Sequence, residues 1–288
     1  MHKSVSAFVE FFRQKNRIRR KKRAKHRANT EFNYRLGVMG IMKNESMNLD
    51  EWVTHYLEVG AGHIYLIDNG STDNTVAKAQ AWVSKGLVSL IERPLRYKQV
   101  AHYEEAINKF GIRTKCEWLL IADLDEFWFC PDGQALTEQL MSFKDVDVIY
   151  ANWRMFGSSG LIDHPVSIRA ELIHSSPTLG DHINTKYMCR TNVIGTKYAI
   201  GIHKLHGACS SRTVSDNFNF NLNHYPIQSL QYFKTVKMAR GDANSSEMDG
   251  FREIAYFRNY DAPCTEENRT LSDLVKNRCL GAGLKKIS

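Results

Sequence analysis

The chain has 288 residues, of which 43% are hydrophobic and 11% aromatic, and this fits an ordinary globular protein with a sizeable core. No stretch approaches the roughly 18 uninterrupted apolar residues that a membrane span requires. The formal net charge of +8 is concentrated in one segment, because residues 1–30 carry eleven Lys and Arg against one Glu, and the remaining 258 residues sum to about −2. The basic character is therefore that of an N-terminal arm.

The arm places an apolar cluster (Phe8, Val9, Phe11 and Phe12) directly before its polybasic run. It has no apolar h-region after its charges and no small-residue cleavage pattern, which argues against a signal peptide. Its composition fits a solvated tail, a helix on an anionic membrane surface, or a nucleic-acid-binding segment. We expect one of the first two and no nucleic-acid partner.

The six cysteines stand at positions 116, 130, 189, 209, 264 and 279, with no Cys-x-x-Cys pair. A chain of this length does not need disulfide bonds, so free thiols in a reducing compartment are expected. The His and Cys residues also lack the ligand spacing of a zinc site. We therefore expect a cytoplasmic protein, with peripheral contact to the cytoplasmic face of a membrane if the arm binds there.

Strands and helices alternate from Tyr34 onward. Short β-rich runs predict strands at 34–42, 63–68, 87–92, 117–127 and 146–153. The runs between them predict helices at 48–60, 75–86, 99–110 and around 135–143. Asn48 is expected to cap the first helix and Gly60 to end it.

The order is less regular after the fifth predicted strand. Residues 154–165 and 174–185 contain many small residues and are expected as long loops. Residues 197–206 alternate like an antiparallel strand, and residues 229–241 predict a helix that Gly241 ends.

The alternation predicts a single α/β domain, residues 31–288, with a mostly parallel central sheet flanked by helices. In such sheets ligands bind beyond the carboxyl ends of the strands. Three predicted strands lead into carboxylates at that edge: Glu45, Asp68, and the group Asp123, Asp125 and Glu126. This convergence predicts a functional site there.

Asp123 and Asp125 would point to the same face of a continuous strand, with Leu124 on the other face. Two adjacent carboxylates repel each other unless a cation lies between them, and oxygen ligands favour Mg²⁺ or Mn²⁺ over zinc. The alternative is that one Asp caps the next turn and the others are solvated. The position after a buried strand and beside Asp68 favours the metal.

Six blocks of sequence occur in a fixed order: KNE (43–45), EW (51–52), YLIDNGSTDNT (65–75), ADLDEF (122–127), WRMFGSSG (153–160) and NHYPIQSLQYFKTVKMARG (223–241). Together they resemble family 2 glycosyltransferases and, more closely, the family 92-type branch, over most of residues 36–242. The resemblance implies the GT-A fold, a single Rossmann-like nucleotide-binding domain that uses a divalent metal and a nucleotide-sugar donor.

By this resemblance the nucleotide sugar would contact Asn44, Glu45, Asp68, Asp123, Lys186, Lys237 and Arg240. Asp68 would hold the uracil or ribose, while the Lys and Arg side chains would offset phosphate charge. The metal ligands would be Asp123, Asp125 and His224. A structural role for His224 and a solvated helix face for Lys237 and Arg240 are the alternatives.

An inverting transfer needs a carboxylate that takes the proton of the acceptor hydroxyl. The segment after residue 160 departs from the family pattern, so three candidates remain open: Glu171, Asp181 and Asp163. Trp153 and Phe156 either stack on the acceptor sugar or pack in the core.

The leading interpretation is a metal-dependent transferase that moves a hexose, for example galactose, from a UDP-sugar to a glycan or glycolipid acceptor with inversion. A nucleotidyltransferase is the first alternative, although such enzymes carry a Gly-rich basic loop where this chain has KNESMN (43–48). The second alternative is a non-enzymatic module that binds a membrane or RNA through the arm.

Overall fold

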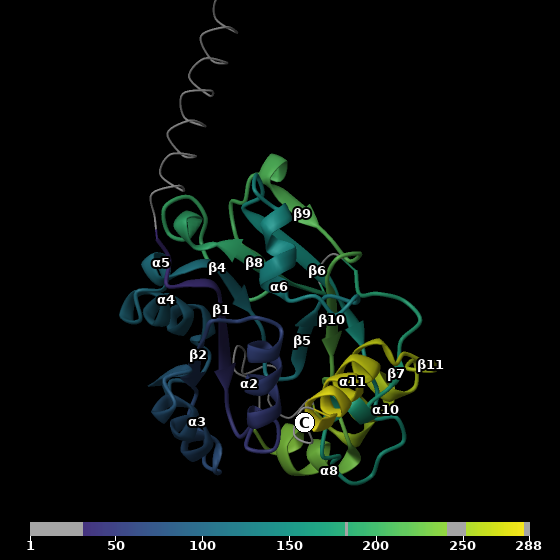
Figure 1. Cartoon of the computed structure of the whole chain (residues 1–288). Coiled ribbons are helices and arrows are strands. Elements are labelled where there is room, and N and C mark those ends of the chain that lie inside the picture. The colour runs from purple at the N-terminus through teal and green to yellow at the C-terminus, as the bar shows by residue number, and fades with distance from the viewer. Residues whose placement is uncertain (1–30, 182–183, 241–251, 285–288) are drawn as a thin grey trace, which may run out of the picture. The chain divides into compact units, whose positions relative to one another are not determined.

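A mixed sheet organises the unit formed by residues 34–288 (Figure 1). The computed structural model describes residues 31–181, 184–240 and 252–284, so the basic arm lies outside the described residues. Within them the sheet has nine strands in the order β3-β2-β1-β4-β8-β6-β10-β5, with β9 paired to β6. The α/β class with helices flanking a central sheet is thereby confirmed.

One half of the sheet is parallel, as predicted. Its strands are β1 (Tyr34–Met42), β2 (His63–Asp68), β3 (Val88–Glu92) and β4 (Cys116–Ile121). β1 lies between β2 and β4, with Met42 opposite Asp68 and Met39 opposite Ile121. The carboxyl ends of these strands therefore meet at one edge.

The other half is mixed, so the sheet as a whole is mostly parallel, as expected, but not purely parallel. Its strands are β5 (Glu126–Phe129), β6 (Val148–Met155), β8 (Thr185–Arg190), β9 (Thr213–Ser215) and β10 (Asn221–His224). β8 runs antiparallel between β4 and β6. Neither β8 nor β10 was predicted. β8 carries the buried cations Lys186 and Arg190, whose partners lie about 60 to 70 residues away in sequence.

The predicted continuous strand 117–127 is wrong. β4 ends at Ile121, and β5 begins at Glu126 and runs antiparallel to β10. The intervening turn is closed because the N–H of Glu126 donates to the carbonyl of Asp123 at 3.0 Å. In return, Oε2 of Glu126 accepts from the N–H of Asp123 at 2.9 Å. Asp123 and Asp125 therefore lie in a turn, and the same-face argument for them does not hold.

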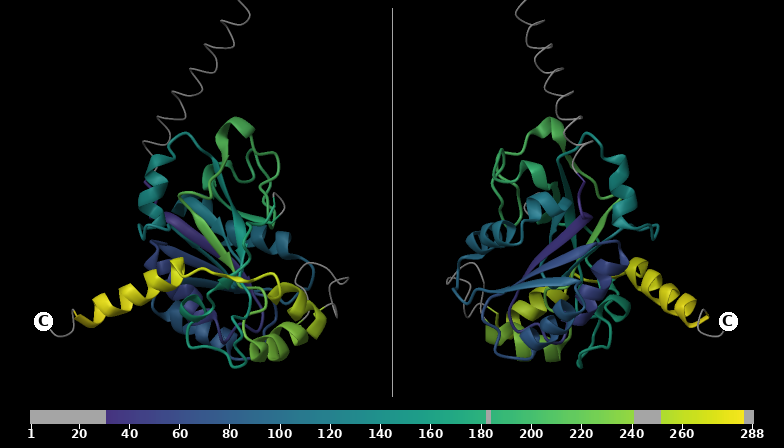
Figure 2. Two further views of the ribbon diagram at one scale, coloured as in Figure 1. Left: turned by 90° about the vertical axis from the view of Figure 1, so that its right-hand side faces the viewer. Right: turned by 60° about the vertical axis from the view of Figure 1, so that its left-hand side comes forward.

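Helices cover both faces of the sheet (Figures 1 and 2). One core contains side chains of α2 (Leu49–Glu58), α3 (Thr75–Ser84), α6 (Leu136–Gln139), α7 (Ile168–Glu171) and α11 (Thr270–Leu284). The opposite core contains side chains of α4 (Gln99–Lys109), α5 (Ile112–Lys115) and the 3₁₀ turn η2 (Thr191–Val193). Two cores on one sheet explain why β1 and β2 read as continuous apolar runs.

The helix predicted at 48–60 forms, but its cap differs. The side chain of Asn48 makes no capping hydrogen bond, and its Nδ2 donates to Oε2 of Glu45 at 3.1 Å instead. Gly60 follows the helix with φ 100°, a left-handed conformation that suits glycine.

The strand predicted at 197–206 is wrong. This segment makes only isolated bridges, Ile194 to Tyr198 and Ala199 to His206. The predicted 229–241 helix is present as α8 (Leu230–Tyr232), a π-helical segment η4 (Phe233–Lys237) and α9 (Met238–Arg240). Gly241 lies outside the described residues.

The remaining elements are short or peripheral. They are η1 (Leu140–Ser142), β7 (His174–Ser175), η3 (Ser210–Arg212), α10 (Ile254–Asp261) and β11 (Glu266–Glu267). No helix in the described ranges combines the length and the apolar character needed to cross a membrane. The five cysteines whose side chains are described are free thiols.

Candidate active site

The loops after β1 and β2 are tied together by hydrogen bonds. Oδ1 of Asn44 accepts from the N–H of Thr72 at 2.8 Å, and the N–H of Asn44 donates to Oγ of Ser71 at 2.9 Å. The N–H of Glu45 donates to Oγ1 of Thr75 at 2.7 Å. The two loops thus form one wall at the carboxyl ends of their strands.

Asp68 lies at the base of this wall and is 2% exposed. Its Oδ2 accepts from the N–H groups of Gly70 at 3.0 Å and Ser71 at 3.1 Å, which fixes the turn after β2. Its Oδ1 is buried and has no hydrogen-bond partner among the described residues. Because a buried acceptor without a partner costs free energy, this oxygen is suited to accept from a bound ligand.

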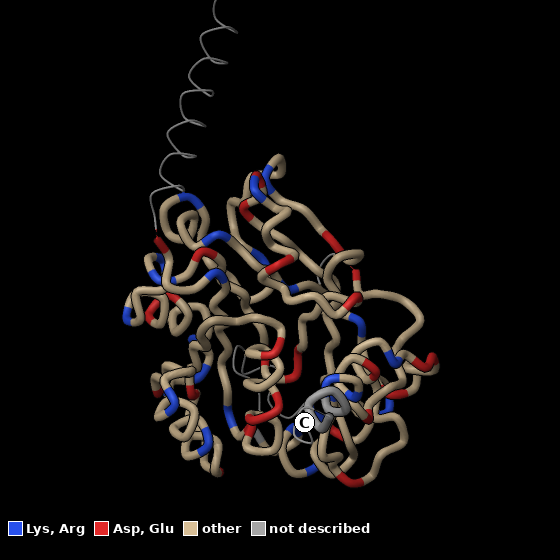
Figure 3. Tube along the Cα trace, in the orientation of Figure 1, with Lys and Arg blue, Asp and Glu red and all other residues tan. Residues whose placement is uncertain are grey.

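Glu45 joins the wall to a distant helix. Its Oε2 accepts from the hydroxyl of Tyr232 in α8 at 2.8 Å and from Asn48. The sequence motif around Glu45 is thus connected to the block that contains His224 and Lys237. Acidic positions gather around α2, which this loop precedes (Figure 3).

Asp123 pairs with a buried lysine. Nζ of Lys186 lies 2.8 Å from Oδ2 of Asp123 and 3.7 Å from Oε1 of Glu126, and Lys186 and Glu126 are 0% exposed. Burial raises the pKa of Glu126 well above its usual range. Burial by itself would lower the pKa of Lys186. The nearby Asp123 and Glu126 raise it by more than burial lowers it, so the pKa lies above its ordinary value. The lysine is therefore charged and holds Asp123 in position.

Asp125 has a second cation as its partner. Its Oδ2 forms an ion pair with Nζ of Lys237, which lies in the π-helical segment η4, and its Oδ1 lies 3.6 Å from Nε2 of His224. π-Helical turns occur frequently at functional sites. The carbonyl of Asp125 accepts from the N–H of Tyr225 at 2.8 Å, which fixes the turn against β10.

Two aromatic rings extend the site beyond His224. The ring of Trp153 lies 4.3 Å from that of His224 and 5.3 Å from that of His203. Nδ1 of His203 donates to the carbonyl of Thr185 at 3.2 Å. Burial and the nearby Lys186 lower the pKa of His203, so its ring is neutral near pH 7. Trp153 thus lines the site.

The residues at this turn fit a hard divalent cation that is shared with a ligand. Within the described residues no three His, Cys, Asp or Glu side chains are placed to hold a metal ion together. Asp125 and His224 nevertheless converge, and Oδ1 of Asp123 is buried without a hydrogen-bond partner. Mg²⁺ and similar ions often use one or two carboxylates and take their other ligands from water and phosphate. Asp125 and His224 would contribute ligands to such an ion, whereas the metal contact expected of Asp123 stays a prediction.

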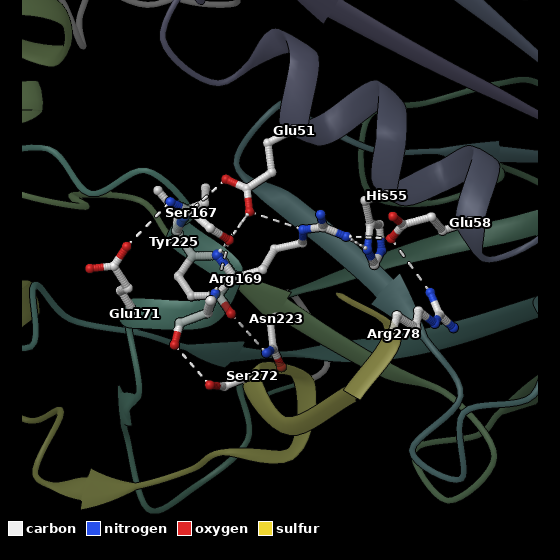
Figure 4. A network of polar contacts seen from close by, with 12 residues as sticks. Glu51, His55, Glu58, Ser167, Arg169, Glu171, Asn223, Tyr225, Ser272 and Arg278 are labelled. Atoms are coloured by element: carbon white, nitrogen blue, oxygen red, sulfur yellow. Dashed lines mark hydrogen bonds and ion pairs between the residues drawn. The ribbon is translucent and has the colours of Figure 1, made fainter. Parts of the chain in front are cut away.

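Of the three candidate bases, Glu171 belongs to a separate network (Figure 4). Its Oε1 accepts from the N–H of Ser167 at 3.4 Å at the start of α7. That helix is held to α2 because Nε of Arg169 lies 3.0 Å from Glu51 and Nη1 lies 2.9 Å from Glu58. These contacts hold α7 against α2, and none of them involves Asp123 or Asp125.

Asp181 is exposed and lies beside Trp153. The N–H of Gly180 donates to the carbonyl of Trp153 at 2.7 Å, and Nδ2 of Asn152 donates to the carbonyl of Asp181 at 2.8 Å. Because Trp153 contacts His224, this segment borders the Asp125 turn.

Asp163 is also exposed but lies in a loop along α8. Its neighbours Ile162 and His164 bond to Gln231, at 2.9 Å and 2.7 Å. Hydrogen bonds thus place the backbone of Asp181 beside Trp153, and that of the Asp163 loop beside α8, which leads into the segment that carries Lys237.

The remaining predicted residues have distinct outcomes. Lys186 lies at the site but contacts carboxylates and has no exposed surface, so its expected phosphate contact stays a prediction. The side chain of Arg240 lies outside the described residues. Phe156 is 1% exposed and packs on Tyr225, which supports the core alternative for it.

Sequence reasoning missed Glu126 as a partner of Lys186 and missed His203 altogether. A lysine inside the buried apolar run TKYMCR was the available signal for the first. No local signal pointed to His203.

Comparison with known proteins identifies the family. The family model for glycosyltransferase family 92 matches residues 38–265. The chain belongs to glycosyltransferase family 92. Its family 92 relatives include a Ricinus communis protein, 24% identical over 67% of this chain and 36% of the relative, and an Oryza sativa subsp. japonica protein, 23% identical over 68% and 34%. The chain thus spans about a third of the length of these curated relatives.

Solved structures match this family 92 chain less closely. The crystal structure of S. aureus TarS aligns with a TM-score of 0.41 and 15% identity, over 78% of this chain and 43% of that chain. Likeness at this level supports no inference about substrate. The family resemblance stated from the sequence motifs is confirmed by the family match.

Proposed function

We propose that this family 92 member transfers a hexose from a UDP-sugar to a glycan or glycolipid hydroxyl, with inversion at the anomeric carbon. The observation that carries the proposal is the turn after β4. There Asp123 and Asp125 each form an ion pair with a lysine, and Oδ1 of Asp125 also lies 3.6 Å from Nε2 of His224. Carboxylates and cations at the carboxyl end of a central strand suit a diphosphate with its counter-ion.

The donor nucleotide would bind against the wall formed by the loops after β1 and β2. Oδ1 of Asp68 and Oδ1 of Asp123 are buried acceptors without partners, so they are suited to N–H or O–H donors of a nucleoside. The Lys186 ammonium, 2.8 Å from Oδ2 of Asp123, holds that carboxylate in place for such a contact. Asn44 acts indirectly, because its side chain is used to hold Thr72.

In the transfer step an acceptor oxygen forms a bond to the anomeric carbon while the bond from that carbon to the β-phosphate oxygen breaks. UDP leaves with the bonding electron pair, and the acceptor proton passes to a carboxylate. A divalent ion, when bound, would neutralise charge on the departing diphosphate. Lys237 lies at the same turn and supplies a positive charge of the protein's own.

Asp181 is the carboxylate that we assign as base. Its backbone lies beside Trp153, whose ring contacts that of His224, and its exposed carboxylate accepts from Nδ2 of Asn184 at 3.1 Å. Glu171 lies at the start of α7, in the network that joins α7 to α2, and Asp163 lies in the loop along α8.

A nucleotidyltransferase is disfavoured by the loop after β1. Such enzymes use free backbone N–H groups of this loop to hold phosphates. Here the N–H groups of Asn44, Glu45 and Ser46 donate to Ser71, Thr75 and Asp73 respectively. They are therefore already used within the protein.

The proposal is tested by incubating the full chain and Mn²⁺ with UDP-glucose, UDP-galactose and UDP-N-acetylglucosamine, and measuring UDP release and thermal stability. We expect one donor to release UDP slowly through attack by water, and UDP with Mn²⁺ to raise the melting temperature. Release of nucleoside monophosphate and sugar phosphate instead, or no stabilisation by UDP, would contradict the proposal.

A further inference from the structure

A cavity of about 560 Å³ lies against the mixed half of the sheet. Its walls are β6, β8, β9 and the segment 204–210, and its polar lining includes Tyr150, Asn152, Thr185, Lys204, His206 and Ser215. This volume falls within the range of about 300–1,000 Å³ that is usual for small-molecule sites. None of the residues assigned above to the nucleotide lines this cavity.

The lining has the chemistry of a sugar site. None of the lining residues is Asp or Glu, whereas hydroxyl groups of Ser and Thr recur around it. The hydroxyl of Tyr150 accepts from the N–H of Leu205 at 3.0 Å, which leaves its own proton to donate. Hydroxyl donors and acceptors with an exposed lysine at Lys204 suit a polyhydroxylated ligand that is neutral or carries an acidic group.

The cavity is coupled to the donor site through neighbouring residues. Asn152 and Thr185 are paired opposite each other in the β6–β8 ladder, and both line the cavity. The next residue along each strand points to the opposite face of the sheet and contacts the donor site, since Trp153 packs on His224 and Lys186 pairs with Asp123.

The segment 204–210 and the candidate base Asp181 also lie near the ends of β6 and β8. His203 precedes Lys204, edges against Trp153 and donates to the carbonyl of Thr185. Asn152 donates to the carbonyl of Asp181 at 2.8 Å. A chain of contacts at this edge of the sheet therefore links the cavity lining and the backbone of Asp181 to Trp153, and through His224 to Asp125.

We propose that this cavity binds the acceptor, a short oligosaccharide, during the transfer reaction. The inference rests on the proposed transferase function. The sugar next to the edge presents its hydroxyl to Asp181 and to the anomeric carbon of the donor, while the rest of the oligosaccharide occupies the space between β6, β9 and the segment 204–210. In the acceptor's absence water takes its place, and the donor is hydrolysed to free sugar and UDP.

A second cavity of about 510 Å³ provides a matched control. It is lined by Glu104, Arg113, Thr196 and Lys197 among others, between α4 and the segment after η2. This lining bonds to its own surroundings, where Arg113, for example, donates to the carbonyl of Ile194 and to Oδ1 of Asn108. A bulky substitution there tests the general effect of filling a surface cavity.

The experiment compares Ser215→Trp, which fills the proposed acceptor cavity, with Thr196→Trp, which fills the control cavity, in the full chain. Binding to a printed array of oligosaccharides is measured in the presence of UDP and Mn²⁺, and UDP-sugar hydrolysis is measured in parallel. We expect Ser215→Trp to reduce array binding at least tenfold while hydrolysis stays within twofold. Thr196→Trp should change neither, and Lys204→Ala should weaken array binding without loss of hydrolysis.

Three results would overturn the inference: array binding by Ser215→Trp equal to that of the wild type, equal losses in Ser215→Trp and Thr196→Trp, or a wild type that hydrolyses donor but binds no oligosaccharide. If Ser215→Trp alters folding, Lys204→Ala, an exposed surface change, decides through the same two readouts. Failure of the transferase proposal is separate, because it appears as absence of UDP release by the wild type.

Discussion

The two halves of the sheet build their parts of the site in different ways. In the parallel half, the loops after β1 and β2 are bonded to each other over about 30 residues of sequence, mainly by side-chain-to-backbone hydrogen bonds. In the mixed half, charged groups from segments 63 and 112 residues apart meet as the pairs Asp123–Lys186 and Asp125–Lys237. The parallel half therefore contributes loops held together by hydrogen bonds, whereas the mixed half contributes ion pairs.

This difference separates two kinds of dependence on single residues. A wall held by several neutral hydrogen bonds loses roughly 1 kcal/mol when one is removed. A buried charge that loses its partner is destabilised by several times more. Substitutions in the mixed half should therefore have large effects, some on the rate of transfer and others on the free energy of unfolding.

The largest effect is expected from the base. Asp181→Asn keeps the shape of the side chain but cannot accept the acceptor proton, so the rate of transfer should fall about a thousandfold. UDP affinity should stay within twofold, because the base acts only in the transition state. Steady-state transfer kinetics and UDP titration measure the two quantities. Glu171→Gln serves as control, and a larger loss of transfer in that variant would move the base to α7.

The next effect concerns the charges on the diphosphate. Asp125→Asn should reduce turnover about a hundredfold and weaken Mn²⁺-dependent UDP binding as well, in contrast to Asp181→Asn. Removal of divalent ions with EDTA should reduce wild-type turnover to a similar extent. Circular dichroism checks that the variant is folded. Undiminished turnover in EDTA would show that Lys237 and the other protein cations suffice without a metal.

A third effect is on stability. Lys186→Met removes the cation that lies between Asp123 and Glu126, so the free energy of unfolding should fall by about 3 kcal/mol in urea denaturation. Adding Glu126→Gln should recover part of that loss, because the buried carboxyl left without a counter-charge is then neutral. An unchanged urea midpoint in the single variant would show that the ion pair contributes little.

The smallest effect on chemistry is expected from the arm. Every residue assigned to the site follows residue 43, so deletion of residues 2–29 should leave UDP binding and transfer to a soluble acceptor unchanged. We propose that the arm recruits the protein to anionic membranes, so vesicle co-sedimentation should fall with the deletion and with rising salt. Equal pelleting of both forms would refute that role.

The parallel half could be predicted because its signals are local. Alternation of apolar strands with helices identified β1 to β4 and their helices, and the carboxylates after them marked the binding edge. The turn at Asp123 could not be predicted, since apolar residues continue through LLIADLDEF and no local pattern indicates the hydrogen bonds between Glu126 and Asp123 that close the turn. The order of strands beyond β4 depended on contacts of this kind.

The sequence by itself determined the α/β class, the family and the carboxylates on which a nucleotide site would be built, because these follow from periodicity and from ordered motifs. The tertiary structure decided which cations meet those carboxylates, that β8 inserts antiparallel between β4 and β6, and that the backbone of Asp181 bonds to Asn152 of β6 while Glu171 lies at the start of α7. The physical reason is that a buried ion pair or a strand pairing joins residues distant in sequence, and its energy depends on burial that no local pattern encodes.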